Sequence, residues 1–227
     1  MKRKGFTFMR MLSLAICVPM LSLCMVACDE DEVKDLNAPC GQAGHVHAVD
    51  LGLSVKWACC NIGANAPEEY GGYYAWGDPE EKDSCIWDRY KWHDSITEEI
   101  TKYNDLDKIK VLELSDDVAH IMWGDGWRMP TQEEMQELMD CCEWEWVSVN
   151  GVKGYRVSGN GNSIFLPAAG SQYKDNFTNQ GSQGCYMSAT LYSADCGLDV
   201  CVGFSKKGYY IINSDRCDGH TIRPVRE

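Results

Sequence analysis

The order of apolar and polar positions predicts a strong amphipathic helix at residues 131–142. Thr131 and Glu134 have the spacing of a capping box, in which each side chain bonds the backbone N–H of the other residue. Met135 and Leu138 begin an apolar stripe at helical spacing, so one face of this helix is expected to pack on the core.

A shorter helix is predicted at residues 115–123, with Ser115 as its N-cap and Gly124 as its stop. Elsewhere short apolar runs are separated by Gly and Asn, and residues 78–114 form a charged, aperiodic insertion. The predicted strands are 49–57, 70–77, 144–149, 154–159, 163–166, 184–188, 200–204, 209–213 and 222–225. Two helices with many short, mainly antiparallel strands predict an α+β domain.

The first 27 residues have the layout of a bacterial lipoprotein signal. Four basic side chains precede an apolar run, and small residues lead to Cys28. The run is too short to span a membrane stably, which favours cleavage before Cys28 and attachment of lipid to its thiol. An ordinary secretory signal with an unrelated cysteine is the alternative.

An acidic run follows Cys28, and residues 28–45 are interpreted as an acidic tether before a domain at 46–227. This run resembles the tag by which Bacteroidetes export lipoproteins to the outer face of the outer membrane. The expected location is therefore the outer membrane, at the cell surface, with the membrane as a partner through the lipid anchor and with no spanning segment.

Composition narrows the class of partner. The chain has a net charge of −13, which becomes −17 once residues 1–27 and their four cations are removed. Such an acidic protein is not expected to bind nucleic acid. The apolar content of 44% and the remaining length suit one globular domain with a sizeable core.

Ten of the thirteen cysteines follow Cys28, an even number that permits pairing in an oxidising compartment. Cysteines concentrate on neighbouring short strands of the C-terminal third, where at least one disulfide is expected. The candidates are Cys185, Cys196, Cys201 and Cys217. A structural zinc site is disfavoured because no Cys-x-x-Cys occurs, and no metal or other cofactor is predicted.

Five segments resemble the Fibrobacter succinogenes major paralogous domain of Bacteroidetes surface lipoproteins. They read VDLGLSVKWA at 49–58, YYAWG at 73–77, GWRMPT at 126–131, NSIFLPAAG at 162–170 and GHTIRPVR at 219–226. The resemblance covers nearly the whole mature chain and implies a C-type-lectin-like fold, shared more distantly with formylglycine-generating enzymes. The chain departs from the family at 186–190, where YMSAT replaces the usual YWSST. The fold hosts enzymes, lectins and adhesins, so it does not decide function.

Candidate chemistry is sparse. Cys196 and Cys201 are the only candidates for the reactive pair implied by the enzyme resemblance, but their surroundings do not match that active site, and no neighbouring Lys or Arg would lower the pKa of either thiol. Oxygen-rich loops at 104–107 and 215–219 suit either calcium or solvated turns. The five histidines are scattered and are interpreted as surface or packing residues.

Trp87, Tyr90 and Trp92 lie in the charged insertion, where no periodicity requires burial, and planar rings beside carboxylates suit sugar rings. These three residues are the candidate ligand-binding surface. The prediction is a non-catalytic recognition or adhesion module for glycan or protein. The alternatives are an enzyme on the same scaffold and a structural subunit of the envelope or of fimbriae.

Overall fold

The computed structural model describes residues 48–124, 126–193 and 197–227. The signal, Cys28 and the tether lie outside these ranges. The strands are β1 Ala48–Val49, β2 Lys56–Ala58, β3 His93–Asp94, β4 Glu99–Ile100, β5 Glu143–Val149, β6 Val152–Gly159, β7 Asn162–Pro167, β8 Ser171–Tyr173, β9 Asn176–Thr178, β10 Gln183–Ser193, β11 Leu198–Ser205, β12 Gly208–Asp215 and β13 Val225–Arg226. The helices are a 3₁₀ turn Trp87–Arg89, α1 Val118–Trp123 and α2 Gln132–Cys141.

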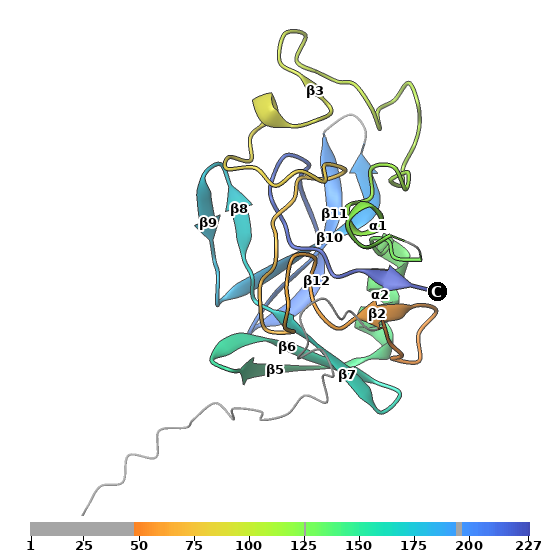
Figure 1. Cartoon of the computed structure of the whole chain (residues 1–227), viewed down its shortest axis with the longest axis vertical. Coiled ribbons are helices and arrows are strands. Elements are labelled where there is room, and N and C mark those ends of the chain that lie inside the picture. Colours follow the sequence, from red (N-terminus) through yellow and green to blue (C-terminus); the bar gives the residue numbers. More distant parts are fainter. Residues whose placement is uncertain (1–47, 125, 194–196) are drawn as a thin grey trace, which may run out of the picture.

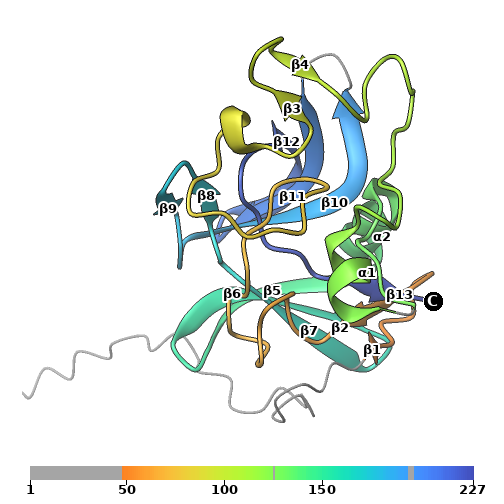
Figure 2. The same ribbon diagram turned by 45° about the horizontal axis from the view of Figure 1, so that its top comes forward.

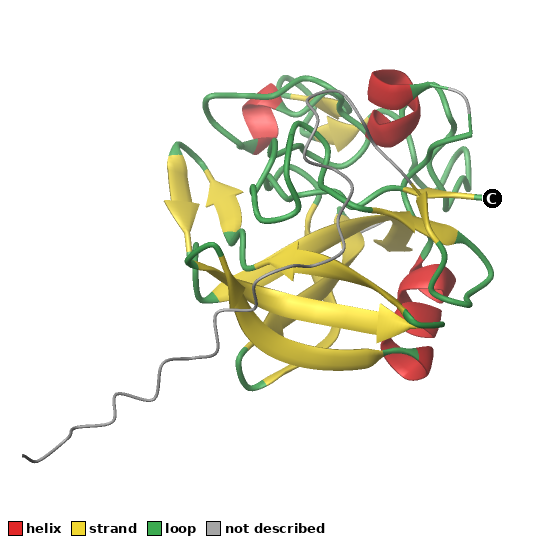
Figure 3. Ribbon diagram, turned by 60° about the horizontal axis from the view of Figure 1, so that its bottom comes forward, coloured by secondary structure: helices red, strands yellow, loops and turns green. Residues whose placement is uncertain are grey.

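The strands form small antiparallel sheets, and the described residues contain two α-helices, which agrees with the α+β expectation. Three-stranded sheets have the orders β1-β2-β13, β5-β6-β7 and β10-β11-β12, while β3-β4 and β8-β9 are isolated hairpins. Figure 1 shows the β8-β9 hairpin beside the long β10-β11-β12 sheet. Figures 2 and 3 show both helices near the C-terminal end and the β5-β6-β7 sheet along one side of the molecule.

Both predicted helices are present, and only the start of the first differs from the prediction. Thr131 caps α2 and Glu134 completes the capping box, while Met135 and Leu138 are buried. Helix α1 begins later than expected, because the side chain of Asp117, rather than that of Ser115, accepts the hydrogen bond from the first turn. Asp117 thus satisfies a backbone N–H that would otherwise be unpaired.

Two-residue turns join the strands of the β5-β6-β7 sheet. Asn160 and Gly161 have φ of 51° and 75°, and Asn150 and Gly151 have φ of 50° and 81°. Two successive positive φ values define the type I′ turn, whose twist matches that of the flanking strands. Residues 159–162 therefore form a tight hairpin between β6 and β7, in agreement with the Gly-Asn-Gly-Asn sequence, which is typical of such turns.

Three predicted strands are shorter than expected. The 49–57 segment is divided between β1 and β2 by a turn at Gly52, whose φ is 78°. The 70–77 segment has a single bridge, between Tyr74 and His220, because glycines with positive φ at Gly71 and Gly77 break the extended backbone. The 222–225 segment is reduced to the two residues of β13. The β8-β9 hairpin is not among the predicted elements.

The main core lies between α2, the β5-β6-β7 sheet and the start of the β10-β11-β12 sheet. It includes Trp57, Met135, Val157, Leu166 and Phe204, each at most 2% exposed. Within the described ranges, no helix is long and apolar enough to cross a membrane.

Candidate functional site

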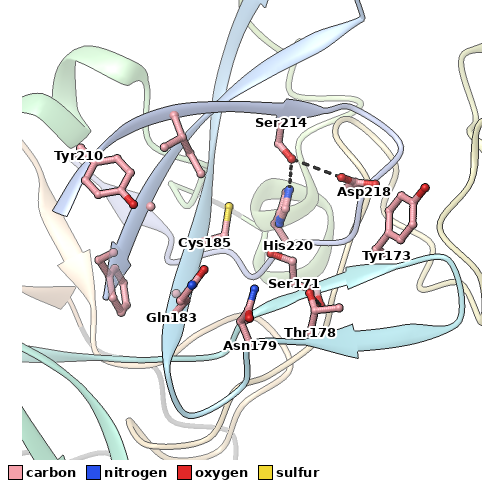
Figure 4. Close-up of a pocket in the computed structure, with 15 residues that line it drawn as sticks. Ser171, Tyr173, Thr178, Asn179, Gln183, Cys185, Tyr210, Ser214, Asp218 and His220 are labelled. Atoms are coloured by element: carbon pink, nitrogen blue, oxygen red, sulfur yellow. Dashed lines mark hydrogen bonds between the residues drawn. The ribbon is translucent and has the colours of Figure 1, made fainter. Parts of the chain in front are cut away.

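The most developed cavity lies between the β8-β9 hairpin and the open face of the β10-β11-β12 sheet (Figure 4). It encloses about 550 Å³ and is here called the hairpin pocket. Its functional lining comprises Ser171, Tyr173, Thr178, Asn179, Gln183, Cys185, Tyr210, Ser214, Asp218 and His220. The pocket therefore unites strands from the last third of the chain with the loop that precedes β13.

The rim of the hairpin pocket carries two large aromatic side chains. Tyr173 on β8 is 51% exposed and Tyr210 on β12 is 57% exposed. Asn179 and Gln183, both exposed, add amide groups near the same opening. Such a rim offers ring faces for apolar contact and neutral donors and acceptors for hydrogen bonding.

Two residues of the inner wall, Cys185 and His220, form a cluster with Cys201 behind them, here called the thiol–imidazole cluster. Their ligand atoms lie within 4.8 Å of one another, and all three residues are buried. Cys185 pairs with Gly203 and Cys201 pairs with Met187 across β10 and β11, so the two thiols occupy diagonal positions on one face of the sheet.

A short chain of hydrogen bonds orients the imidazole. His220 Nε2 lies 2.8 Å from Ser214 Oγ, and the Ser214 hydroxyl donates to Asp218 Oδ2 at 3.5 Å. A hydroxyl that donates to a carboxylate accepts from the imidazole, so Nε2 carries a proton. Among the described residues, His220 Nδ1 has no hydrogen-bond partner, although it is buried. Figure 4 shows the ring beside Cys185.

The two thiols have opposite ionisation tendencies. A hydrogen bond from Cys201 and the charge of His220 hold the pKa of Cys185 well below its ordinary value, against the effect of burial. Burial and the neighbouring Cys185 raise the pKa of Cys201 well above its ordinary value. Cys185 is therefore the thiolate of the pair and Cys201 keeps its proton.

The imidazole and the neighbouring carboxyls respond to the same environment. Burial lowers the pKa of His220, but the Cys185 thiolate outweighs burial and raises this pKa to about 9. Burial raises the pKa of Asp199 to about 7 and that of Asp218 to about 6. The ionisation of each group in the cluster therefore depends on that of its neighbours, and the two carboxyls ionise at a higher pH than ordinary aspartates do.

The disulfide expected in this region is not formed among three of its four candidates. Cys185, Cys201 and Cys217 are free thiols, and Cys196 lies outside the described residues. Among the described cysteines, strand pairing places Cys185 next to Cys201. Cys59 does take part in a disulfide.

The expectation that the aromatic trio lies on the surface is wrong for Tyr90. This residue is 3% exposed, and its hydroxyl donates to the carbonyl of Trp76. Trp87 packs edge-on against Tyr90, and Trp92 donates its indole N–H to Gly77, so both are partly buried. The insertion folds back onto the core because its rings find carbonyl and aromatic partners there. A binding role for Trp87 and Trp92 stays a prediction.

The oxygen-rich loop at 104–107 is occupied by its own backbone. Asp107 accepts hydrogen bonds from the N–H groups of Tyr103 and Asn104, and Asn104 Oδ1 accepts from Leu106. These bonds are typical of a side-chain-stabilised turn. In the second loop, Asp218 interacts with Ser214 of the hairpin pocket.

Sequence reasoning missed His220 as a site residue. It lies within the GHTIRPVR segment but shows no metal or nucleophile spacing, and it reaches the sheet because the next residue, Thr221, bridges to Tyr186 of β10. Comparisons with family models, with curated proteins and with solved structures found no match to this chain.

Proposed function

We propose that the protein is a lipid-anchored recognition module at the outer-membrane surface, with a C-type-lectin-like fold, that binds a glycan in the hairpin pocket. The observation that carries this proposal is the combination of two half-exposed tyrosines with neutral amides and hydroxyls around one cavity of about 550 Å³. A cavity of this size is within the range of small-ligand sites.

Glycans match this lining better than other common ligands. A sugar ring presents C–H faces that pack on Tyr173 and Tyr210, and hydroxyls that bond Asn179, Gln183 and Thr178. Asp218 is the one carboxylate among the described lining residues, and no lysine or arginine occurs among them. This balance favours a neutral polar ligand over a phosphorylated one, because the one basic side chain among these residues, His220, lies against Cys185, whereas phosphate sites use arginine or lysine partners.

The fold proposal rests on the architecture and the sequence motifs together. Small antiparallel sheets with two α-helices are compatible with a C-type-lectin-like domain. Arg223 of the GHTIRPVR segment and Trp57 of the VDLGLSVKWA segment are fully buried, as framework residues of a shared fold would be.

The test is a glycan-array screen of the full chain carrying Cys28→Ser, followed by titration of each retained glycan. Tyr173→Ala and Tyr210→Ala are each expected to weaken binding about tenfold, which corresponds to about 1.4 kcal/mol of lost ring contact. Tyr192→Ala is the matched control, because Tyr192 is 57% exposed on β10 and does not line the hairpin pocket.

Two results would overturn the proposal. One is the absence of any glycan retained by the parent protein at micromolar concentration. The other is retention that Tyr173→Ala and Tyr210→Ala leave unchanged, since the ligand would then lie elsewhere.

A further inference from the structure

The thiol–imidazole cluster has the composition and the spacing of a metal site. Its donors are two sulfurs and one imidazole nitrogen, supplied by β10, β11 and the loop before β13. Thiolate and imidazole together select soft or borderline cations with a filled d shell. Hard cations such as Mg²⁺ and Ca²⁺ prefer oxygen donors and do not suit a site of two sulfurs and one imidazole nitrogen.

The distances require little rearrangement. A cation bound at about 2.3 Å from sulfur and about 2.0 Å from nitrogen holds its donors roughly 3.5–4 Å apart. The donor atoms of Cys185, Cys201 and His220 already lie within 4.8 Å of one another. Side-chain shifts of about an ångström, without movement of the paired strands, therefore bring all three to bonding distance.

A second observation points to a ligand independently of the spacing. Among the described residues His220 Nδ1 lacks a hydrogen-bond partner, and the residue is only 2% exposed. A buried polar atom without a partner is costly and rare in folded proteins. Its other nitrogen, Nε2, is held by Ser214, which donates to Asp218. A metal-binding histidine is typically fixed in this way, through its second ring nitrogen, by a hydrogen-bonded outer shell.

Access and local charge agree with cation binding. Cys185 and His220 line the hairpin pocket, which provides a path from solvent, whereas Cys201 lies behind them with its thiol 3.7 Å from Asp199 Oδ2. Asp199 Oδ1 and Asp218 Oδ1 are buried without a hydrogen-bond partner in the described part of the chain. Their carboxylates offset part of the positive charge that a cation brings into this buried site.

We propose that Cys185, Cys201 and His220 bind one thiophilic cation with a filled d shell, Cu(I) or Zn(II), at the inner wall of the hairpin pocket. The two sulfurs bind as thiolates and Nδ1 binds through its lone pair. Every proton that the two thiols and Nδ1 carry before binding is released to solvent, and no electron is transferred. This site goes beyond the glycan proposal and does not depend on it.

The experiment titrates the full-length Cys28→Ser chain, reduced and free of oxygen, with Cu(I) and separately with Zn(II), each buffered by a competing chelator. Native mass spectrometry counts the bound ions. The parent protein is expected to bind one equivalent of cation tightly. Cys185→Ser and Cys201→Ser are each expected to bind this equivalent at least 100-fold more weakly. Cys217→Ser is the matched control, because Cys217 is a buried free thiol outside the cluster, and it should bind as the parent does.

Alkylation of the parent protein keeps the test valid if a cluster variant fails to fold. The bound cation should protect Cys185 and Cys201 from iodoacetamide, while the exposed Cys141 reacts at the same rate with or without metal. Preference for Cu(I) or for Zn(II) is decided by which titration gives this protection at the lower free concentration.

Three outcomes would overturn the metal site. They are the absence of a tight equivalent for both cations, an equivalent that survives both cluster substitutions, and a Cys185–Cys201 disulfide in protein isolated without reductant. Because Tyr173→Ala and Tyr210→Ala leave the three donors intact, loss of glycan binding in those variants does not count against the metal site.

Discussion

Replacing Arg223 by leucine should destabilise the fold more than any surface substitution in this chain. The Arg223 side chain is fully buried, and its guanidinium donates to three acceptors in different parts of the fold. Nε bonds Asn61 Oδ1 at 2.8 Å, Nη1 bonds the carbonyl of Ala58 at 3.1 Å, and Nη2 bonds the carbonyl of Phe165 at 2.8 Å. One side chain thus ties β2 and its following loop to β7.

The magnitude follows from the acceptors that leucine would leave behind. Each buried acceptor without a donor costs about 1–3 kcal/mol, so three would cost about 3–9 kcal/mol. Removal of the buried charge returns part of this cost, because burial disfavours the cation and lowers the pKa of Arg223. This return offsets part of the cost of the three acceptors, so we expect Arg223→Leu to cost about 3–5 kcal/mol, in the lower part of that range.

Urea denaturation followed by tryptophan fluorescence measures this effect. With a slope of about 2 kcal/mol per molar urea, the midpoint should fall by about 2 M. Arg223→Lys should be nearly as damaging, because one ammonium cannot reach three divergent acceptors. Arg156→Leu is the control: Arg156 pairs with the exposed Glu145 at 3.0 Å, and its loss should cost less than about 1 kcal/mol. A midpoint for Arg223→Leu close to that of Arg156→Leu would refute the reasoning.

The remaining predictions concern a turn, an ion pair and the anchor. Gly170→Ala should cost about 2–4 kcal/mol in the same assay, because φ is 69° and a Cβ would lie 2.0 Å from a β9 carbonyl oxygen, whereas Gly161→Ala, with open space, should cost about 1–2. Burial raises the pKa of Asp116, but hydrogen bonds from Lys102 outweigh it, so this pKa lies below the ordinary 3.8. The stabilisation of the fold by the Asp116 carboxylate is therefore complete above pH 3.8 and is lost as pH falls through the lower pKa of the folded state. Asp116→Asn should lower the free energy of unfolding by about 1–2 kcal/mol at pH 7 and by less in acid. A loss that stays constant with pH would contradict this. Cys28→Ser should release the protein from membrane fractions, and unchanged partitioning with no lipid on the mature terminus would contradict lipidation.

The parts of the fold that the sequence predicts well depend on neighbouring residues. The capping box of Thr131 and Glu134 spans one helical turn, and the Asn160-Gly161 turn needs only two residues with positive φ. Neighbouring residues alone decide whether these two features form, so a short sequence motif is sufficient to predict them. The Asp117 cap shows that such patterns place a helix start only to within about two residues, since neighbouring polar residues compete for the N-cap position.

The site could not be predicted in the same way, because its residues meet through long-range pairing. Cys185 and Cys201 become neighbours only when β10 and β11 adopt a register that sets Cys185 opposite Gly203. The sequence offered four cysteines in this region without a pairing, because spacing along the chain contains no information about strand register. The insertion misled for the opposite reason: Tyr90 lacks periodic neighbours, yet its ring and hydroxyl find partners in the core that no local pattern reveals.

A glycine on the sheet explains why the pocket reaches the Cys185 thiol. Gly203, opposite Cys185, has no side chain to cover the sulfur, and a Cβ there would lie 2.8 Å from Ile212 Cδ1. At Gly184 a Cβ would lie 2.1 Å from the ring of Phe204, so this glycine lets that ring pack flat beneath the pocket. Side chains alternate between the two faces of a strand, so Gly184 and Phe204 lie on the face opposite to the one that bears Cys185. Gly203 alone leaves the Cys185 face open, and it therefore opens the path along which a ligand reaches the thiol–imidazole cluster.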